Sequence, residues 1–311
     1  MFKNIFIILI LVFFVINVLT ISCLVPQPTA TSYQPEKAKA VILGEYDISD
    51  YYNLKPPLNN LDEFMVKFSE CNNVLYIFSY IYDSINKSID PCFLLVNKTD
   101  MSKIDYYKIR LENHYPVLYS SDSHLYCSGI AVTNNNIFSK LIIKNNDFLT
   151  YFILKTDLNG KNIKVFDNSD DIGIGLLNNL YYFGYNRISK KLYTSRDNLL
   201  SCYNYDQTND IFKKEFEFNM NKTLRIKDTN DKKIVTEDYQ GAHTLVFSIL
   251  EIRDINELDK VLFRVNTYYL GGISVRITDA IYCNDGYLWI IVNRNQQLQL
   301  LKLQPTGIAS N

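Results

Sequence analysis

The sequence predicts an all-β fold in which one supersecondary unit recurs along the chain, and two observations carry this prediction. Tyrosine occurs 24 times and phenylalanine 18 times, against 11 glycines and 8 prolines, a composition that favours strands over helices. Apolar segments that run into an aspartate and a short polar turn return about every 50 residues, a spacing typical of repeated units that cannot bury their hydrophobic faces alone.

The first element in chain order is an apolar segment that predicts export. Lys3 precedes an unbroken apolar run from Ile5 to Ile16, which suits a secretory signal better than a membrane-spanning helix. We therefore expect residues 1–22 to be a signal peptide and the rest of the chain to lie outside the cytoplasm. An uncleaved signal anchor is the alternative.

The end of this segment, Leu19-Thr20-Ile21-Ser22-Cys23, resembles the lipobox of bacterial lipoproteins. It fits the permissive form of that pattern and departs from the stricter form, which has leucine where Thr20 stands. The resemblance implies that acyl chains on Cys23 hold the protein on a membrane, because two or more chains anchor stably. A eukaryotic secreted glycoprotein remains an alternative, since Asn86-Lys87-Ser88, Asn97-Lys98-Thr99 and Asn221-Lys222-Thr223 are acceptor sequons.

Three parts follow the signal in the predicted domain organisation. Residues 23–39, rich in Pro, Gln, Thr and Ser, predict a lipidated cysteine with a flexible tether, and residues 40–311 predict a single domain. Within that domain Ala40–Tyr46 reads as a strand. Leu61, Phe64, Met65 and Phe68 have helical spacing after Asn60, an N-cap residue with Glu63 three positions on, and predict one short helix.

The recurrence is clearest at four aspartates, Asp100, Asp157, Asp206 and Asp254, which follow one another at intervals of 57, 49 and 48 residues. Gln304 occupies the equivalent point 50 residues later. One unit shows four strands joined by turns: Asn179–Asn186, Lys191–Arg196, Leu199–Tyr205 and Phe212–Phe218. The nearly continuous apolar runs Val74–Tyr82 and Leu180–Phe183 are expected to be innermost strands.

Four-stranded units of this length, stacked radially, describe a β-propeller. The last unit runs out of chain after Leu298–Leu303, and the strand Ala40–Tyr46 can supply its missing outer strand and close the ring. We predict about five blades, or six if residues 219–243 contain a short one. A pair of β-sandwich domains is the alternative fold.

Charge and cysteine content exclude some classes of function. The formal net charge is −1, without a long basic block, so we expect no nucleic-acid partner. Besides Cys23 there are five cysteines, at positions 71, 92, 127, 202 and 283; an odd number cannot all pair within the chain. We expect buried free thiols, with a Cys71–Cys92 disulfide as the exception.

Catalytic and metal-binding patterns are mostly absent from the sequence. His114, His124 and His243 lack zinc-ligand spacing, and no nucleophile elbow occurs, so we expect no metal and no cofactor. The acidic residues Asp122, Asp171 and Asp279 precede candidate inner strands. In placement they resemble the carboxylates of five-bladed glycan-cleaving enzymes, one acting as general acid and one as base or nucleophile; ordinary turn aspartates are the alternative.

Adjacent tyrosine pairs favour a binding function. The pairs Tyr51-Tyr52, Tyr106-Tyr107, Tyr181-Tyr182 and Tyr268-Tyr269 should each expose one ring, because neighbours on a strand face opposite ways. Our leading hypothesis is a membrane-anchored, extracytoplasmic lipoprotein that binds a protein or glycan partner without catalysis. A glycan-active hydrolase is the alternative, and an envelope-assembly scaffold is a third reading.

Overall fold

The structure, a computed structural model, describes residues 40–305 with gaps at 50–65, 84–87, 102–103, 110, 112–122, 146–147, 168–171, 175–179, 221–223, 243–244, 267–269, 271–275 and 295–296. The predicted signal peptide and tether lie outside these residues. All elements in the described part are strands, and it contains no helix long and apolar enough to cross a membrane.

The strands form five four-stranded antiparallel units. We call these units blades I to V, numbered by the position of their innermost strand along the chain. Blade I consists of β2 (Phe68–Cys71), β3 (Val74–Asp83), β4 (Ser88–Asn97) and β5 (Ile104–Lys108). Blade II consists of β6 (Ser123–Val132), β7 (Asn136–Asn145), β8 (Phe148–Asp157) and β9 (Lys164–Phe166). Blade III consists of β10 (Tyr182–Asn186), β11 (Lys191–Arg196), β12 (Leu199–Asp206) and β13 (Ile211–Asn219).

Blade IV consists of β14 (Arg225–Asn230), β15 (Lys233–Ala242), β16 (Leu245–Asp254) and β17 (Val261–Asn266). Blade V consists of β18 (Arg276–Tyr282), β19 (Leu288–Arg294), β20 (Gln297–Pro305) and the first strand of the chain, β1 (Ala40–Asp47). The fold is thus a five-bladed β-propeller, and the predicted fold class and blade number are confirmed. The described residues of the segment 219–243 hold the first two strands of blade IV and form no sixth blade.

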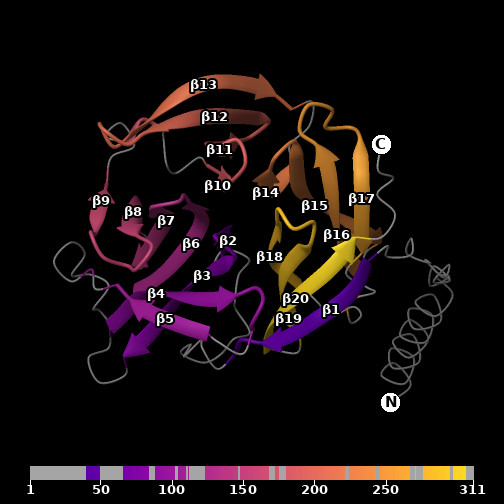
Figure 1. The fold of residues 1–311 in the computed structure, drawn as a ribbon, viewed down its shortest axis with the longest axis horizontal. Helices are drawn as coiled ribbons and strands as arrows, with labels where there is room; N and C mark the ends of the chain where they lie inside the picture. The colour runs from indigo at the N-terminus through magenta and orange to yellow at the C-terminus, as the bar shows by residue number, and fades with distance from the viewer. Residues whose placement is uncertain are drawn as a thin grey trace, which may run out of the picture. The chain divides into compact units, whose positions relative to one another are not determined.

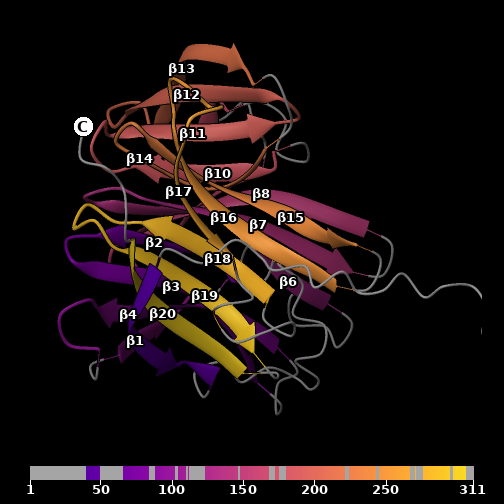
Figure 2. The ribbon, with the colours of Figure 1, turned by 90° about the vertical axis from the view of Figure 1, so that its right-hand side faces the viewer.

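The first strand of each blade is its innermost one, and each inner strand contacts the next: β2, β6, β10, β14, β18 and again β2. Figure 1 shows these five strands around the centre, and Figure 2 shows β10 to β13 following one another outward. The closest approach is between β6 and β10, which pair in parallel at Ile130 and Gly184. A Cβ at Gly129 would lie 2.6 Å from the Cβ of Phe183, so this approach requires glycine.

The two ends of the described chain close the ring. β1 pairs antiparallel with β20, from Ala40 opposite Pro305 to Asp47 opposite Gln299. The amide of Ile48 then donates to the carbonyl of Leu298 at 2.9 Å, and Arg294 Nη1 lies 2.9 Å from Glu45 Oε1. The prediction that the N-terminal strand supplies the missing outer strand of the last blade is confirmed.

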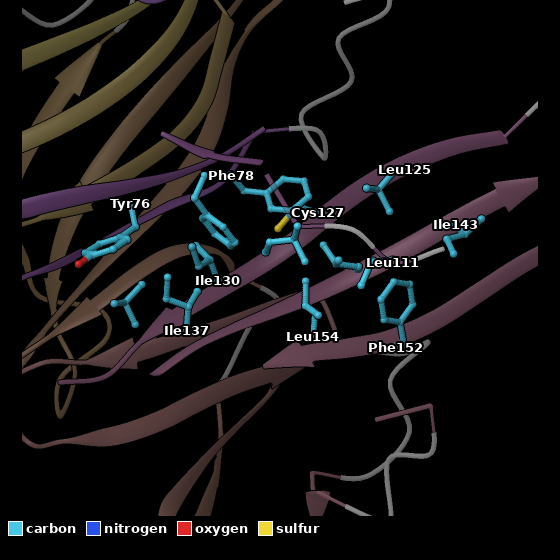
Figure 3. Packing of buried hydrophobic residues seen from close by; sticks show 14 of the residues in the cluster. Tyr76, Phe78, Leu111, Leu125, Cys127, Ile130, Ile137, Ile143, Phe152 and Leu154 are labelled. Atoms are coloured by element: carbon cyan, nitrogen blue, oxygen red, sulfur yellow. The ribbon is translucent and has the colours of Figure 1, made fainter. Parts of the chain in front are cut away.

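Five hydrophobic clusters fill the spaces between neighbouring blades, one at each interface of the ring. Figure 3 shows the cluster between blades I and II, where Phe78 from β3 meets Ile130 and Cys127 from β6 and Leu154 from β8. The cluster between blades V and I includes Trp289, which is completely buried. Because every blade buries both faces against its neighbours, none has a complete core of its own.

Three of the four recurring aspartates end the third strand of a blade. The side-chain Oδ1 of Asp157, Asp206 and Asp254 each accepts the backbone N–H two residues later, at 2.9, 3.1 and 2.9 Å. This local bond turns the chain out of the ladder. In blade I the residue at this position is Asn97, which accepts from Thr99 N–H at 2.9 Å, and Asp100 lies three residues further along.

Three local predictions are wrong: those of a helix, of an innermost strand and of a disulfide. Phe68 begins strand β2, so the predicted helix does not extend to it; residues 61–65 lie outside the described part. Val74–Tyr82 forms the second strand of blade I, because the shorter β2 lies inside it.

Cys71 and Cys92 form no disulfide, and all five described cysteines are buried free thiols. The two belong to different hydrophobic clusters, on opposite faces of blade I.

Candidate functional site

Charged side chains from four blades lie along the propeller axis. Residues of all five inner strands line the space at the centre of the ring. At one point Lys67, just before β2, lies 3.3 Å from Asp279 of β18, and the amide of Phe68 donates to the other oxygen of Asp279 at 3.1 Å. This pair joins blades V and I, the interface at which the ring closes.

A second set of charged side chains lies towards the end of the axis where each inner strand turns into the second strand of its blade. Arg187, from the β10–β11 turn, lies 2.9 Å from Asp228 of β14 and 3.4 Å from Glu70 of β2. Lys98 contacts the other oxygen of Glu70 and lies 2.7 Å from Asp285. The chain Asp285–Lys98–Glu70–Arg187–Asp228 therefore connects blades V, I, III and IV.

Burial sets the protonation behaviour of the two axial aspartates. Desolvation raises the pKa of Asp228 to about 6, although Arg187 opposes the shift. Burial also raises the pKa of Asp279, against the attraction of Lys67 and Lys227. The two carboxyl groups line the same small cavity of about 20 Å³ between the inner strands. That volume holds about one water molecule and no sugar ring.

A larger cavity, which we call the axial pocket, lies where the ion chain reaches the hairpin turns. Its volume is about 400 Å³, within the usual range for small-ligand sites. Its lining residues are Glu70, Cys71, Asn72, Asn73, Lys98, Val132, Asn134, Tyr185, Arg187, Asn284 and Asp285. The lining is mostly polar, and its four asparagines come from three different hairpin turns.

Local sequence explains how the asparagines reach the pocket. Asn72 and Asn73 both have positive φ, 49° and 66°, the pair of values that a two-residue hairpin turn requires and that asparagine tolerates. In the β18–β19 turn Gly286, at φ 83°, donates its N–H to the carbonyl of Cys283 at 3.0 Å. This turn presents Asn284 and Asp285 at the pocket.

Of the three acidic residues proposed from sequence, the structure describes one. Asp279 lies within β18, not before the strand, and its side chain is buried in a salt bridge. Asp122 and Asp171 lie outside the described residues, as do His114, His243, Tyr51, Tyr52, Tyr268 and Tyr269. Tyr106 and Tyr181 are exposed at 58% and 66%, while Tyr107 and Tyr182 turn inward, as the pairing rule predicted.

The described residues contain no group of three or more His, Cys, Asp or Glu side chains placed to hold a metal ion. Sequence reasoning missed Glu70, Lys98, Arg187 and Asp228. A signal for Asp228 was the adjacent charged pair Lys227-Asp228, which follows the apolar Ile226.

Comparison with known proteins finds related folds only. No family model and no curated protein matches the sequence. A glycosyl hydrolase from Bacteroides ovatus superposes with a TM-score of 0.43 and 11% identity over 79% of this chain and 85% of its own. A structure from the GH130 family of mannoside phosphorylases, which contains glycoside hydrolases that target β-1,2 mannosidic linkages in Candida mannan, gives 0.46 and 10% over 89% and 98%.

The β-propeller domain of the Trilobed protease from Pyrococcus furiosus gives a TM-score of 0.31 and 10% identity over 74% of this chain and 64% of its own. Identities this low carry no information about the activity of this chain.

Proposed function

We propose that this protein is a lipid-anchored, extracytoplasmic propeller that binds a glycan in its axial pocket. The observation that carries the proposal is the composition of the pocket: its cations and anions pair with one another, while four asparagine amides line the same cavity. Charges that are already paired offer little to an ionic ligand. The amides remain as the groups that select what binds.

Asparagine amides suit sugar hydroxyls because both groups donate and accept hydrogen bonds. Asn134 and Asn284 are exposed at the pocket, and Tyr185 adds a rigid aromatic surface to the lining. A cavity of about 400 Å³ accommodates a short saccharide rather than a folded partner. These features favour a glycan over a protein as the ligand of this site.

Binding is tested by calorimetric titration of the detergent-solubilised full chain with neutral gluco-, manno- and xylo-hexaoses. Asn134→Ala combined with Asn284→Ala should weaken binding about tenfold, because two hydrogen bonds of about 0.5–1.5 kcal/mol each are lost. Asn72→Gly, which keeps the positive φ, should weaken it less. Asp197→Gly, also at positive φ but in the β11–β12 turn, is the control and should leave binding unchanged.

The anchor is tested separately. The lipobox-like sequence supports acylation of Cys23, and Cys23→Ala should lose metabolic acyl label and move from the membrane to the soluble fraction. Retention of the variant in the membrane would contradict the proposed lipid anchor.

Glycan hydrolysis is a second candidate, favoured by Asp228 and Asp279, two buried carboxyl groups with raised pKa on neighbouring inner strands. A general acid needs such a raised pKa. The small cavity between them and the basic partner of each count against it. New reducing ends released from the hexaoses by the wild type, and abolished in a folded Asp279→Asn variant, would replace the binding proposal with this one.

A further inference from the structure

The first strand of the chain, β1, presents an apolar edge at the outside of the ring. It is the outermost strand of blade V, and in the described part it pairs with β20 alone (Figure 1). Its side chains Val41, Ile42 and Leu43 are 50%, 39% and 46% exposed. Within the described residues no other three successive large apolar side chains are exposed. The backbone groups on the free edge of β1 therefore lie beside apolar side chains that are open to contact.

A bulge accounts for the exposure of three neighbours in sequence. The register of β1 on β20 shifts between Ile42 and Gly44, and such a shift bends a strand and re-aims its side chains. β1 stays paired with β20 on both sides of the bulge, from Ala40 to Ile42 and from Gly44 to Asp47. The bulge therefore does not end the strand.

The outer strands of the other blades carry features that oppose pairing with a further strand. β13 exposes the charged side chains of Lys213–Glu217, and β5 exposes Asp105 and Lys108. β9 is three residues long, and β17 carries Arg264. β1 has no charged residue in Ala40–Gly44. It is thus the outer strand whose edge is least protected against another strand.

The charges on the two sides of this apolar run mirror each other in sequence. Glu45 and Asp47 follow Ile42 by three and five residues, and Lys39 and Lys37 precede it by the same distances. Two copies of the segment, placed antiparallel and centred on Ile42, set the lysines of one copy opposite the acidic residues of the other at both ends. Opposite charges that face each other across two strands stabilise the pair.

We propose that two copies of this protein associate through their β1 strands, antiparallel and centred on Ile42, into a dimer with twofold symmetry. The interface is isologous, so each contact occurs twice. It pairs the free backbone edge and covers Val41, Ile42 and Leu43. A lipid surface fits β1 less well, because lipid offers no partners to backbone groups. The mirrored charges favour a second copy over an unrelated strand.

The interface is tested by sedimentation equilibrium of the detergent-solubilised full chain over a range of concentrations. The wild type should form a dimer. Ile42→Lys places like charges opposite each other at the twofold axis and should raise the dissociation constant of the dimer about tenfold or more. Phe148→Lys adds the same charge at a phenylalanine of β8 that is 79% exposed, and this control should leave the dimer unchanged. Urea midpoints equal to that of the wild type show that the variants are folded.

Charge reversal tests the register. Lys39→Glu and Glu45→Lys should each weaken the dimer, because like charges then face each other, and the double variant should restore it. Glu45→Lys also loses the contact with Arg294 of the same chain. The double variant loses that contact equally, so recovery of the dimer isolates the contact between copies.

Each contrary outcome overturns the proposal. A wild type that stays monomeric at every concentration rules out the dimer, and a dimer that Ile42→Lys leaves intact has its interface elsewhere. Failure of the double variant to restore the dimer excludes the register centred on Ile42. A Cys23→Ala protein that stays on the membrane until Ile42→Lys is added would show that β1 binds lipid instead.

Discussion

At the scale of single residues, the buried charged side chains along the propeller axis are the least expected feature of the protein. Burying a charge costs several kcal/mol even when it is paired, yet Arg187, Asp228 and Glu70 all have side chains at most 7% exposed. Arg187 also donates to the carbonyl of Tyr282 at 2.8 Å, and Asp228 accepts the amide of Tyr282 at 2.9 Å. Arg187 and Asp228 thereby join blade III to blades IV and V through contacts with fixed geometry.

Removing one partner should therefore destabilise the fold. Asp228→Asn leaves the buried guanidinium of Arg187 with Glu70 as its one charged partner among the described residues and should lower the free energy of unfolding by about 3 kcal/mol, read as a shift of the urea midpoint. Asp197→Asn is the matched control, because its partner Arg196 lies 3.9 Å away on the surface, and should cost under about 1 kcal/mol. Equal effects of the two substitutions would show that the Arg187–Asp228 pair contributes no more to the free energy of unfolding than an exposed pair does.

The sequence predicts the strands far better than it predicts these residues. Asp279 stands out because it precedes an apolar run, Ala280-Ile281-Tyr282. Arg187 follows Tyr185-Asn186 in what reads as an exposed turn, and Lys98 lies inside a sequon-like segment. Hydropathy cannot distinguish a residue facing a polar channel from one facing water. Only the closure of the ring brings these residues together.

At the scale of elements, a side-chain contact joins the outer parts of blades II and III. Asp210, in the turn before β13, lies 2.6 Å from Lys155 of β8 and 2.7 Å from Lys164 of β9. Tyr205 of β12 donates to the same carboxylate. Burial alone would raise the pKa of Asp210, but the bonds from Lys155, Lys164 and Tyr205 outweigh it and lower the pKa to about 2.

The pH dependence of stability should reveal this contact. A carboxyl group with a lowered folded-state pKa stabilises the fold above its unfolded value of about 3.9, and that stability is lost as pH falls through about 2. Asp210→Asn, which tolerates the positive φ of 59°, should cost about 2 kcal/mol at pH 7 and progressively less below pH 4. A difference between the proteins that stays constant from pH 7 to pH 2 would contradict this role.

The repeat was readable at this scale because its cause is local. Asp157, Asp206 and Asp254 recur because each ends the third strand of its blade. There its side chain accepts a hydrogen bond from the backbone N–H two residues later. The inner strand β2 was missed for the opposite reason. Its four residues, Phe68–Cys71, contain a buried Ser69 and Glu70, so they show neither a continuous apolar run nor a clean alternation. The spacing of Leu61, Phe64, Met65 and Phe68 then suggested a helix instead.

At the scale of the whole molecule, the ring depends on every interface at once. Each of the five hydrophobic clusters is shared by two blades, so opening one interface exposes apolar surface on both sides of it. The interface between blades V and I also contains the Lys67–Asp279 pair. Blade V differs from the others because its outer strand comes from the opposite end of the described chain.

Truncation should separate the role of β20 from that of the chain beyond it. A protein ending at Arg294 lacks the strand that lies between β19 and β1 and should lose cooperative thermal unfolding. A protein ending at Pro305 keeps every described strand and should unfold like the full chain. Cooperative unfolding of the shorter protein at an unchanged temperature would mean that closure through β1 and β20 contributes little to stability.

The pairing of β1 with β20 also imposes an order in time. Ala40 is synthesised 265 residues before its partner Pro305, whereas each of blades I to IV is contiguous in sequence and is complete as soon as its fourth strand has been made. Contacts between such distant segments form late in folding, because the intervening chain must be brought together first. β1 therefore stays without its partner until β20 has been made, and a chain that ends before β20 cannot close the ring through this pairing.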